Sequence, residues 1–213
     1  MDYQFWHQRW QENRIGFHLP QPNPLLLENL SALSLDKDAR IFIPLSGKSL
    51  DIGWLLAQGF RVVAIELSQK AVDELMLELQ LEFTQHQVGE LIYYQHDQLD
   101  LFVGDIFHLS KDLLGHIDAI YDRAALVALP EATRKQYTAH LIELAHVPQL
   151  IISYEYDQDS YEGPPFSVTE AEIYRHYQHA YQIKLLEQVD LSDSFKGQNA
   201  MEKVWYLKPK LEQ

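Results

Sequence analysis

Ile41-Phe42-Ile43-Pro44-Leu45-Ser46-Gly47-Lys48-Ser49 is the stretch that decides the fold. Its first five residues form a short apolar run, which is typical of a buried strand, and Ser46-Gly47 follow as a tight turn. Leu50, Trp54 and Ala57 then recur at helical intervals before Gly59, a common helix stop. The stretch therefore predicts a strand, a turn and a helix.

The next segment repeats this pattern. Arg61-Val62-Val63-Ala64-Ile65-Glu66 predicts a second strand, and Ser68 is a good N-cap for the helix after it. One face of that helix is apolar, through Val72, Leu75, Met76, Leu79 and Phe83. Two successive strand-helix units imply a parallel sheet with right-handed crossovers.

Three further parallel strands are expected, at 101–103, 117–121 and 150–154. Two strand-like runs at 183–189 and 203–207, joined by the polar stretch 190–199, predict a C-terminal antiparallel hairpin. The segment 85–98 is polar and leaves a hairpin and an irregular insertion both open. The expected architecture is α/β, a seven-stranded, mostly parallel sheet with helices on both faces.

Composition limits the class of protein. The 213 residues fit one domain, 1–213, and the formal charge of −14 repels phosphate backbones and anionic lipid surfaces, so nucleic acid and membranes are not expected partners. The absence of cysteine excludes disulfides and thiolate metal sites. The ten histidines form no plausible metal set, so no metal is expected. With no secretion signal at the N-terminus, we expect a cytoplasmic protein.

Ligands of open α/β sheets bind where strands end and helices begin. There, Gly47 allows close backbone approach, and Glu66 follows it by 19 positions at the end of the second strand, where a carboxylate can accept the hydroxyls of a ribose. A P-loop is excluded, because Phe42 stands where its first glycine belongs, and the three-glycine dinucleotide signature is also absent.

Other predicted site residues lie at neighbouring strand exits. Asp105-Ile106-Phe107 offers a polar edge and apolar faces to an adenine ring, and Arg123 is a permanent cation, with Asp122 beside it to orient it or to face a substrate. Trp10 lies on an aromatic N-terminal segment, 1–35, that is expected to cover the ligands as a lid on the core, 36–213.

A series of motifs runs in order from Phe5 almost to the C-terminus: Phe5-Trp6, Trp10, Asn13, Ile15-Gly16-Phe17-His18, Pro44 to Asp51, Glu66-Leu67-Ser68 with Ala71-Val72, Gly104-Asp105-Ile106-Phe107, Asp122 to Leu129, Gly163-Pro164-Pro165-Phe166 and Glu202-Lys203. Together these motifs resemble the thiopurine S-methyltransferase family. Two positions depart from the family pattern: Ser46 replaces a usual cysteine, and Ala124 replaces a usual glycine, which affects the backbone beside Arg123.

The resemblance implies a Rossmann-like class I methyltransferase, a cytoplasmic monomer that uses S-adenosylmethionine to methylate sulfur in aromatic and heterocyclic thiols, such as thiopurines, and releases S-adenosylhomocysteine. It assigns cofactor binding to Trp10, Leu45, Glu66 and Arg123, with Gly47 and Ile106 lining the same pocket. Because the sulfonium is already activated, direct displacement needs no dedicated base, and Asp122 is the one candidate for a catalytic role. Two alternatives stay open: methyl transfer to another small nucleophile, such as a selenium or tellurium compound, a halide or an amine, and a non-catalytic module that binds the cofactor.

Overall fold

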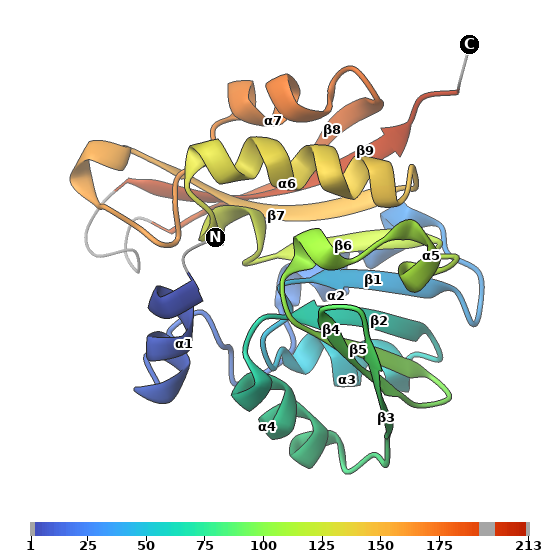
Figure 1. Ribbon diagram of the computed structural model, residues 1–213. Helices are drawn as coiled ribbons and strands as arrows, with labels where there is room; N and C mark the ends of the chain where they lie inside the picture. The colour runs from blue at the N-terminus through green and yellow to red at the C-terminus, as the bar shows by residue number, and fades with distance from the viewer. Residues whose placement is uncertain (1–2, 192–198, 212–213) are drawn as a thin grey trace. The chain divides into compact units, whose positions relative to one another are not determined.

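The computed structural model describes residues 3–191 and 199–211, and its contacts divide the chain into two compact units. The first comprises Met1–Glu28 and Leu35–Asp118, and the second comprises Asn29–Ser34 and Ala119–Gln213. Figure 1 labels the helices and strands of each unit. None of the helices in the described part is long and apolar enough to cross a bilayer.

Five strands form the sheet of the first unit, in the order β3-β4-β5-β2-β1. Strands β1, β2 and β5 are parallel neighbours, whereas β4 is antiparallel to both β3 and β5. The strands are β1 (Arg40–Pro44), β2 (Arg61–Glu66), β3 (Thr84–Val88), β4 (Leu91–Gln95) and β5 (Leu99–Val103). The helices are α1 (Tyr3–Gln11), α2 (Pro24–Asn29), which ends one residue into the second unit, α3 (Leu50–Ala57), α4 (Gln69–Leu79), η2 (Ile106–His108) and α5 (Lys111–Leu114).

The second unit contains four strands in the order β6-β7-β9-β8. Strands β6 and β7 are parallel, and β9 pairs antiparallel with β7 and with β8. The strands are β6 (Ala119–Arg123), β7 (Gln149–Tyr156), β8 (Tyr181–Asp190) and β9 (Ala200–Pro209). The helices are η1 (Leu30–Leu33), η3 (Leu126–Ala128), α6 (Glu131–Leu144), η4 (Gln158–Ser160) and α7 (Glu170–Tyr177).

Local chemistry explains why the principal helices begin where they do. The side chains of Ser49, Ser68 and Thr169 each accept a hydrogen bond from a backbone N–H in the first turn of α3, α4 and α7. Such caps satisfy donors that have no partner inside the helix. The first helices after β1 and β2 thus start directly beyond the strand ends, which places backbone N–H groups at that edge of the sheet.

The predicted parallel strands and the C-terminal antiparallel hairpin are confirmed, but the strand count was wrong. The described residues form nine strands, not seven, because 84–95 folds into the hairpin β3-β4 and extends the first sheet. All of β3 is exposed except Val88, which is half-buried, so apolar periodicity gives no signal for this strand. Most of the predicted linker 190–199 lies outside the described residues.

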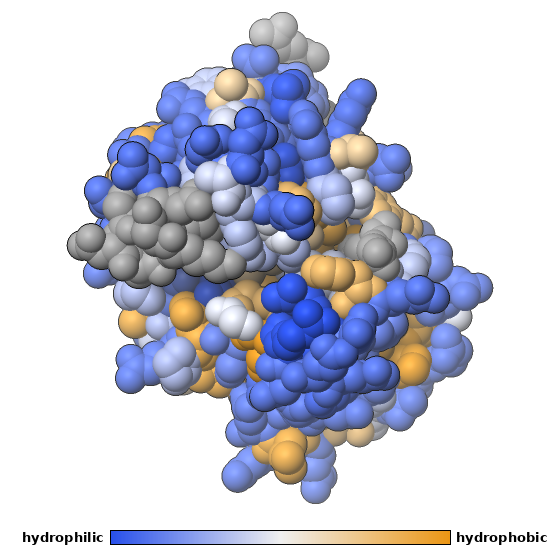
Figure 2. All heavy atoms as spheres, turned by 90° about the vertical axis from the view of Figure 1, so that its left-hand side faces the viewer, coloured by the Kyte–Doolittle hydropathy of each residue, from blue (hydrophilic) through white to orange (hydrophobic). Residues whose placement is uncertain are grey.

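The surface in Figure 2 is mostly hydrophilic, with hydrophobic side chains only in separate groups. The most exposed large apolar residues of the described part are Leu77 and Leu211, at 78% and 93% exposed. Exposed apolar residues of this kind are common on folded domains.

Candidate functional site

A sharp turn follows β1. Leu45 and Gly47 both have positive φ, at 45° and 55°, and the Ser46 N–H donates to Ile65 O of β2 at 3.0 Å. A left-handed conformation is costly for a leucine, so the strain at Leu45 is a local cost of turning the chain at this edge. The turn leaves the Gly47 N–H directed at the end of the neighbouring strand.

Glu66, the last residue of β2, receives that N–H. Its Oε2 accepts from Gly47 N at 2.8 Å, and its Oε1 accepts from Ser68 N at 2.8 Å. Burial raises the pKa of this carboxyl, while the N–H groups of Ser68, Gly47 and Leu67 act in the opposite direction. Glu66 is buried, with 6% of the residue surface exposed. The structure therefore joins the two residues that the sequence spacing predicted to meet.

Trp10 packs directly against this turn. A Cβ added to Gly47 would lie 3.2 Å from Trp10 Cζ2, so the glycine allows the indole to approach the backbone. Trp10 is 3% exposed, its ring meets Phe17 edge-on at 5.6 Å, and Lys70 Nζ donates to its carbonyl at 2.8 Å. The end of helix α1 is thereby fixed over the Gly47 turn by contacts within the first unit.

The exit of β5 carries Asp105 and Ile106. Asp105 Oδ1 accepts from Phe107 N at 3.1 Å, and its Oδ2 accepts from the Tyr3 hydroxyl of α1. That bond raises the pKa of Tyr3 to about 12. Ile106 is fully buried as the first residue of η2. The polar edge expected for an adenine ring is thus engaged by α1, and a ligand amine at Asp105 would compete with Tyr3.

Arg123 and Asp122 belong to the second unit, at the end of β6. Arg123 is half-buried, and within the described ranges its guanidinium has no hydrogen-bond partner. Its charge lowers the pKa of Glu202, although burial outweighs this effect and leaves that pKa raised. Asp122 is fully buried and accepts a hydrogen bond from the Tyr137 hydroxyl at 2.6 Å. Binding of a ligand by Arg123 stays a prediction.

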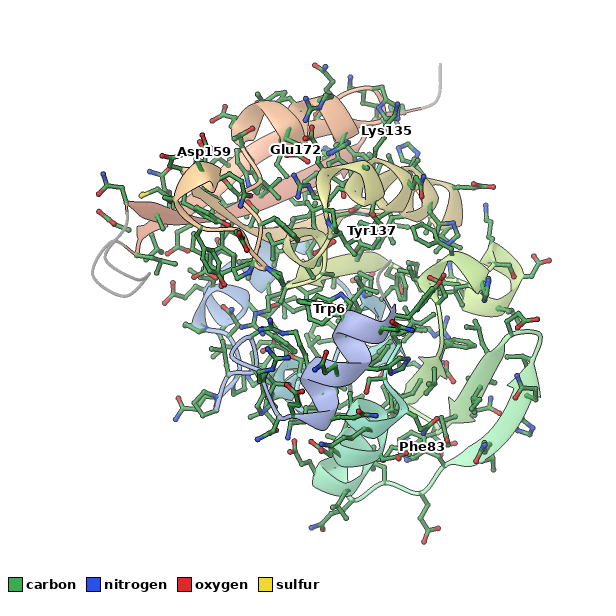
Figure 3. All side chains as sticks on the ribbon, turned by 60° about the vertical axis from the view of Figure 1, so that its left-hand side comes forward. Trp6, Phe83, Lys135, Tyr137, Asp159 and Glu172 are labelled. Atoms are coloured by element: carbon green, nitrogen blue, oxygen red, sulfur yellow. The ribbon has the colours of Figure 1, made fainter. Side chains whose placement is uncertain are left out.

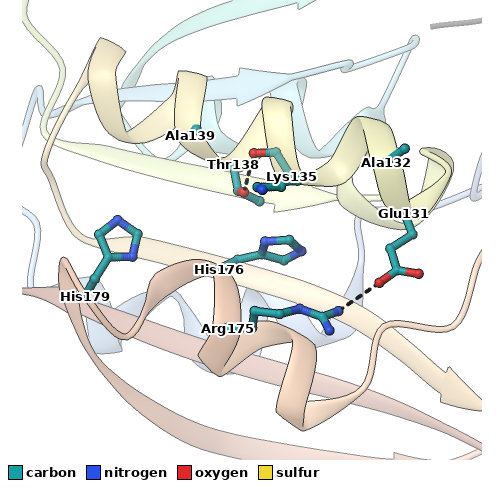
Figure 4. Close-up of a pocket in the computed structure, with 8 residues that line it drawn as sticks. All are labelled: Glu131, Ala132, Lys135, Thr138, Ala139, Arg175, His176 and His179. Carbon is teal, nitrogen blue, oxygen red and sulfur yellow. Dashed lines mark hydrogen bonds and ion pairs between the residues drawn. The ribbon is translucent and has the colours of Figure 1, made fainter.

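A groove of about 550 Å³ lies between α6 and α7 of the second unit (Figure 4). Its charged groups are mostly paired: Arg175 lies 3.0 Å from Glu131, and His176 lies 3.1 Å from the buried Glu172. No residue predicted to bind a ligand lines this groove. We assign it no part in the site.

Three residues that contact the predicted site were not identified from the sequence: Tyr3, Lys70 and Tyr137. Tyr3 shares one face of α1 with Trp6, which Figure 3 labels, and with Trp10, and the spacing of three and four residues was a usable signal. Lys70 and Tyr137 gave none, because each bonds a residue that only the folded chain brings near.

Solved structures share this fold. A 1,6-didemethyltoxoflavin-N1-methyltransferase from Burkholderia thailandensis, solved with S-adenosylhomocysteine, matches with a TM-score of 0.68 at 14% identity, covering 98% of this chain and 87% of that one. A magnesium protoporphyrin IX methyltransferase from Synechocystis PCC 6803 matches with a TM-score of 0.67 at 13% identity, covering 97% and 100%. At such identities the likeness shows the fold alone, and it confirms the predicted fold class.

Sequence relatives give the family. A thiopurine S-methyltransferase from Acinetobacter baylyi is 52% identical over 99% of this chain and 100% of its own length. Another from Teredinibacter turnerae is 46% identical over 95% of each chain. The family model described as thiopurine S-methyltransferase matches residues 1–210. The chain therefore belongs to the thiopurine S-methyltransferase family.

Proposed function

We propose that this chain transfers the methyl group of S-adenosylmethionine to the sulfur of aromatic and heterocyclic thiols such as thiopurines. The observation that carries the proposal is the hydrogen bond of 2.8 Å between Gly47 N and Glu66 Oε2 at the carboxyl ends of adjacent parallel strands. Family membership supplies the reaction class.

The first unit fits an adenosyl ligand. The carboxylate of Glu66 is oriented by backbone N–H groups at the ends of two adjacent strands, and each of its oxygens has a further lone pair that could accept a ribose hydroxyl. Trp10 supplies an aromatic cover beside Gly47, and a Cβ at position 47 would fill the narrow space between them. Leu45 and Ile106 are assigned to the same ligand on the family resemblance.

The cofactor, when bound, supplies a methyl group already activated by its sulfonium. The work left for this chain is to orient both reactants and exclude water, which is what a buried turn covered by an indole is suited to do. Arg123 is a half-buried guanidinium with no hydrogen-bond partner in the described residues, which is consistent with its proposed contact to the cofactor.

We further propose that the chain acts as a monomer in the cytoplasm, takes no nucleic acid as a partner and forms one functional domain. The family model spans residues 1–210 and so includes both units. The formal charge of −14 disfavours binding to nucleic acid.

The test is a panel of acceptors incubated with the chain and methyl-labelled S-adenosylmethionine. Methylation of aromatic thiols, with S-adenosylhomocysteine formed in equal amount, is expected. The proposed acceptor would be wrong if no thiol were methylated while another acceptor was, such as a selenium compound, a tellurium compound, a halide or an amine.

Cofactor binding by calorimetry separates the remaining alternative. Tight binding without turnover on the whole panel would indicate a non-catalytic module.

A further inference from the structure

Asp122 is a fully buried acid whose oxygens are both occupied. Its Oδ1 accepts from Leu126 N at 3.0 Å, its Oδ2 accepts from the Tyr137 hydroxyl at 2.6 Å, and Ala125 N is a third donor. With 0% exposure, the carboxylate cannot be reached by a substrate. In this conformation the Asp122 carboxylate therefore does not touch reacting atoms, and its contacts indicate a structural role.

The segment held is the turn that follows Arg123. Ala124 has φ of 59°, a left-handed conformation that residues with a side chain rarely adopt. The two backbone donors to Asp122, Ala125 and Leu126, come directly after this residue. The carboxylate thus closes a loop across Arg123 and Ala124, and its bonds offset the strain at Ala124.

The same turn is fixed from its far side. Arg134 of α6 donates to Leu129 O at 2.8 Å, and Phe166 N donates to Val127 O at 2.6 Å. Arg134 is itself buried and paired with Glu172 at 2.6 Å. Tyr137, labelled in Figure 3, lies on the same helix α6. Helix α6 therefore bonds both to Asp122 and to Leu129, on the two sides of the turn.

We propose that Asp122, supported by Tyr137, is a positioning residue that fixes the strained turn at Ala124 and thereby sets where the Arg123 guanidinium lies. This inference rests on the proposed function, in which Arg123 contacts the cofactor. It assigns Asp122 no proton transfer.

Tyr177 provides a matched control. Like Tyr137 it is a fully buried tyrosine on a helix of the second unit, and the charge of Asp122 affects the pKa of both. Its hydroxyl, however, has no hydrogen-bond partner among the described residues. Tyr177→Phe therefore makes the same chemical change as Tyr137→Phe without removing a hydrogen bond.

The experiment measures S-adenosylhomocysteine affinity by calorimetry, and kcat and KM for an aromatic thiol, in folded variants checked by circular dichroism. Asp122→Asn and Tyr137→Phe are each expected to weaken affinity about 3- to 10-fold, as loss of one buried hydrogen bond would. Tyr177→Phe is expected to change it by less than about 2-fold. In an Arg123→Gln background, Asp122→Asn should have no further effect, because both changes then remove the same interaction.

Rescue gives a second readout. Ala124→Gly removes the left-handed strain, so it should restore most of the affinity that Asp122→Asn loses. Effects of Asp122→Asn and Arg123→Gln that simply multiply, or an Asp122→Asn defect that glycine at 124 leaves unchanged, would overturn the positioning role. Wild-type chain that neither binds S-adenosylhomocysteine nor methylates thiols would instead overturn the proposed function.

Discussion

Glu66 and Asp122 are two buried carboxylates, each at or next to the last residue of a parallel strand, one in each unit. Both accept N–H bonds from the chain just beyond the strand, and burial raises the pKa of both. They differ in what completes their surroundings. Among the described residues, the donors to the Glu66 carboxylate are backbone N–H groups, whereas Asp122 also accepts from the Tyr137 hydroxyl; the two residues are 6% and 0% exposed.

The difference separates two uses of the same side-chain chemistry. A carboxylate held by backbone N–H groups can still accept hydroxyl groups from a ligand through its remaining lone pairs. A carboxylate enclosed by a side chain of its own fold can only hold that fold together. A position at a strand exit therefore makes an acid a candidate for ligand binding, and the side chains that already bond to it distinguish a binding role from a structural one.

The largest expected effect concerns Asp122, the carboxylate enclosed by Tyr137. The pKa of Asp122 is about 6, against 3.8 for the ordinary group, because burial outweighs its three donors. In the unfolded chain this carboxyl loses its proton at a lower pH than in the folded chain. The free energy of unfolding therefore falls by about 3 kcal/mol as the pH rises from about 4 to about 6. Urea unfolding between pH 4 and 7.5 should show this fall in the wild type, and Asp122→Asn should remove it.

Glu66 and Glu202 also have raised pKa values, but both are present in the wild type and in the Asp122→Asn variant. The difference between the two plots of unfolding free energy against pH therefore reports on Asp122. Identical pH slopes in both chains would mean that Asp122 is not closed off from water.

The role of Glu66 is tested by the affinity for the cofactor. Glu66→Ala should weaken binding of S-adenosylmethionine by roughly 1–3 kcal/mol through lost charged hydrogen bonds, measured by calorimetry. Glu82→Ala, an exposed glutamate of the same unit, is the control and should leave affinity unchanged. Equal affinity in the Glu66 variant would refute the ribose assignment.

A smaller effect tests the turn that aims Glu66. Gly47→Ala places a Cβ 3.2 Å from Trp10 at φ of 55°, whereas Gly89→Ala, at φ of 60°, meets nothing within 4 Å. Both changes carry the left-handed strain, about 1 kcal/mol. Thermal unfolding should show both losses, and only the Gly47 variant should also lose cofactor affinity. Matching losses of affinity would show that the Trp10 contact is irrelevant to binding.

The smallest effects concern the tyrosines beside the closed carboxylate. Tyr137→Phe should cost about 1 kcal/mol in the free energy of unfolding, because it leaves Asp122 Oδ2 without its hydroxyl donor. Tyr177→Phe should be neutral or stabilising, since it removes a buried hydroxyl that has no partner in the described residues. A larger loss at Tyr177 than at Tyr137 would reverse the comparison.

The meeting of Gly47 and Glu66 was predictable because one strand-helix-strand crossover fixes it locally. The parallel strands were predictable for a different reason, since each contains an uninterrupted run of apolar residues. Spacing along α1 places Tyr3 on the face of Trp10 but does not identify Asp105 as its partner. The bond from Tyr137 to Asp122 depends on packing between elements, which no spacing specifies. The closed state of Asp122, which decides its role, therefore could not be predicted from the sequence.

The most direct measurement is a crystal structure of the chain with S-adenosylhomocysteine. We expect both ribose hydroxyls within hydrogen-bond distance of the Glu66 carboxylate, with Trp10 against the ligand and Asp122 still bonded to Tyr137. A ribose bound elsewhere, with Glu66 still bonded only to the backbone of Gly47, Leu67 and Ser68, would contradict this expectation.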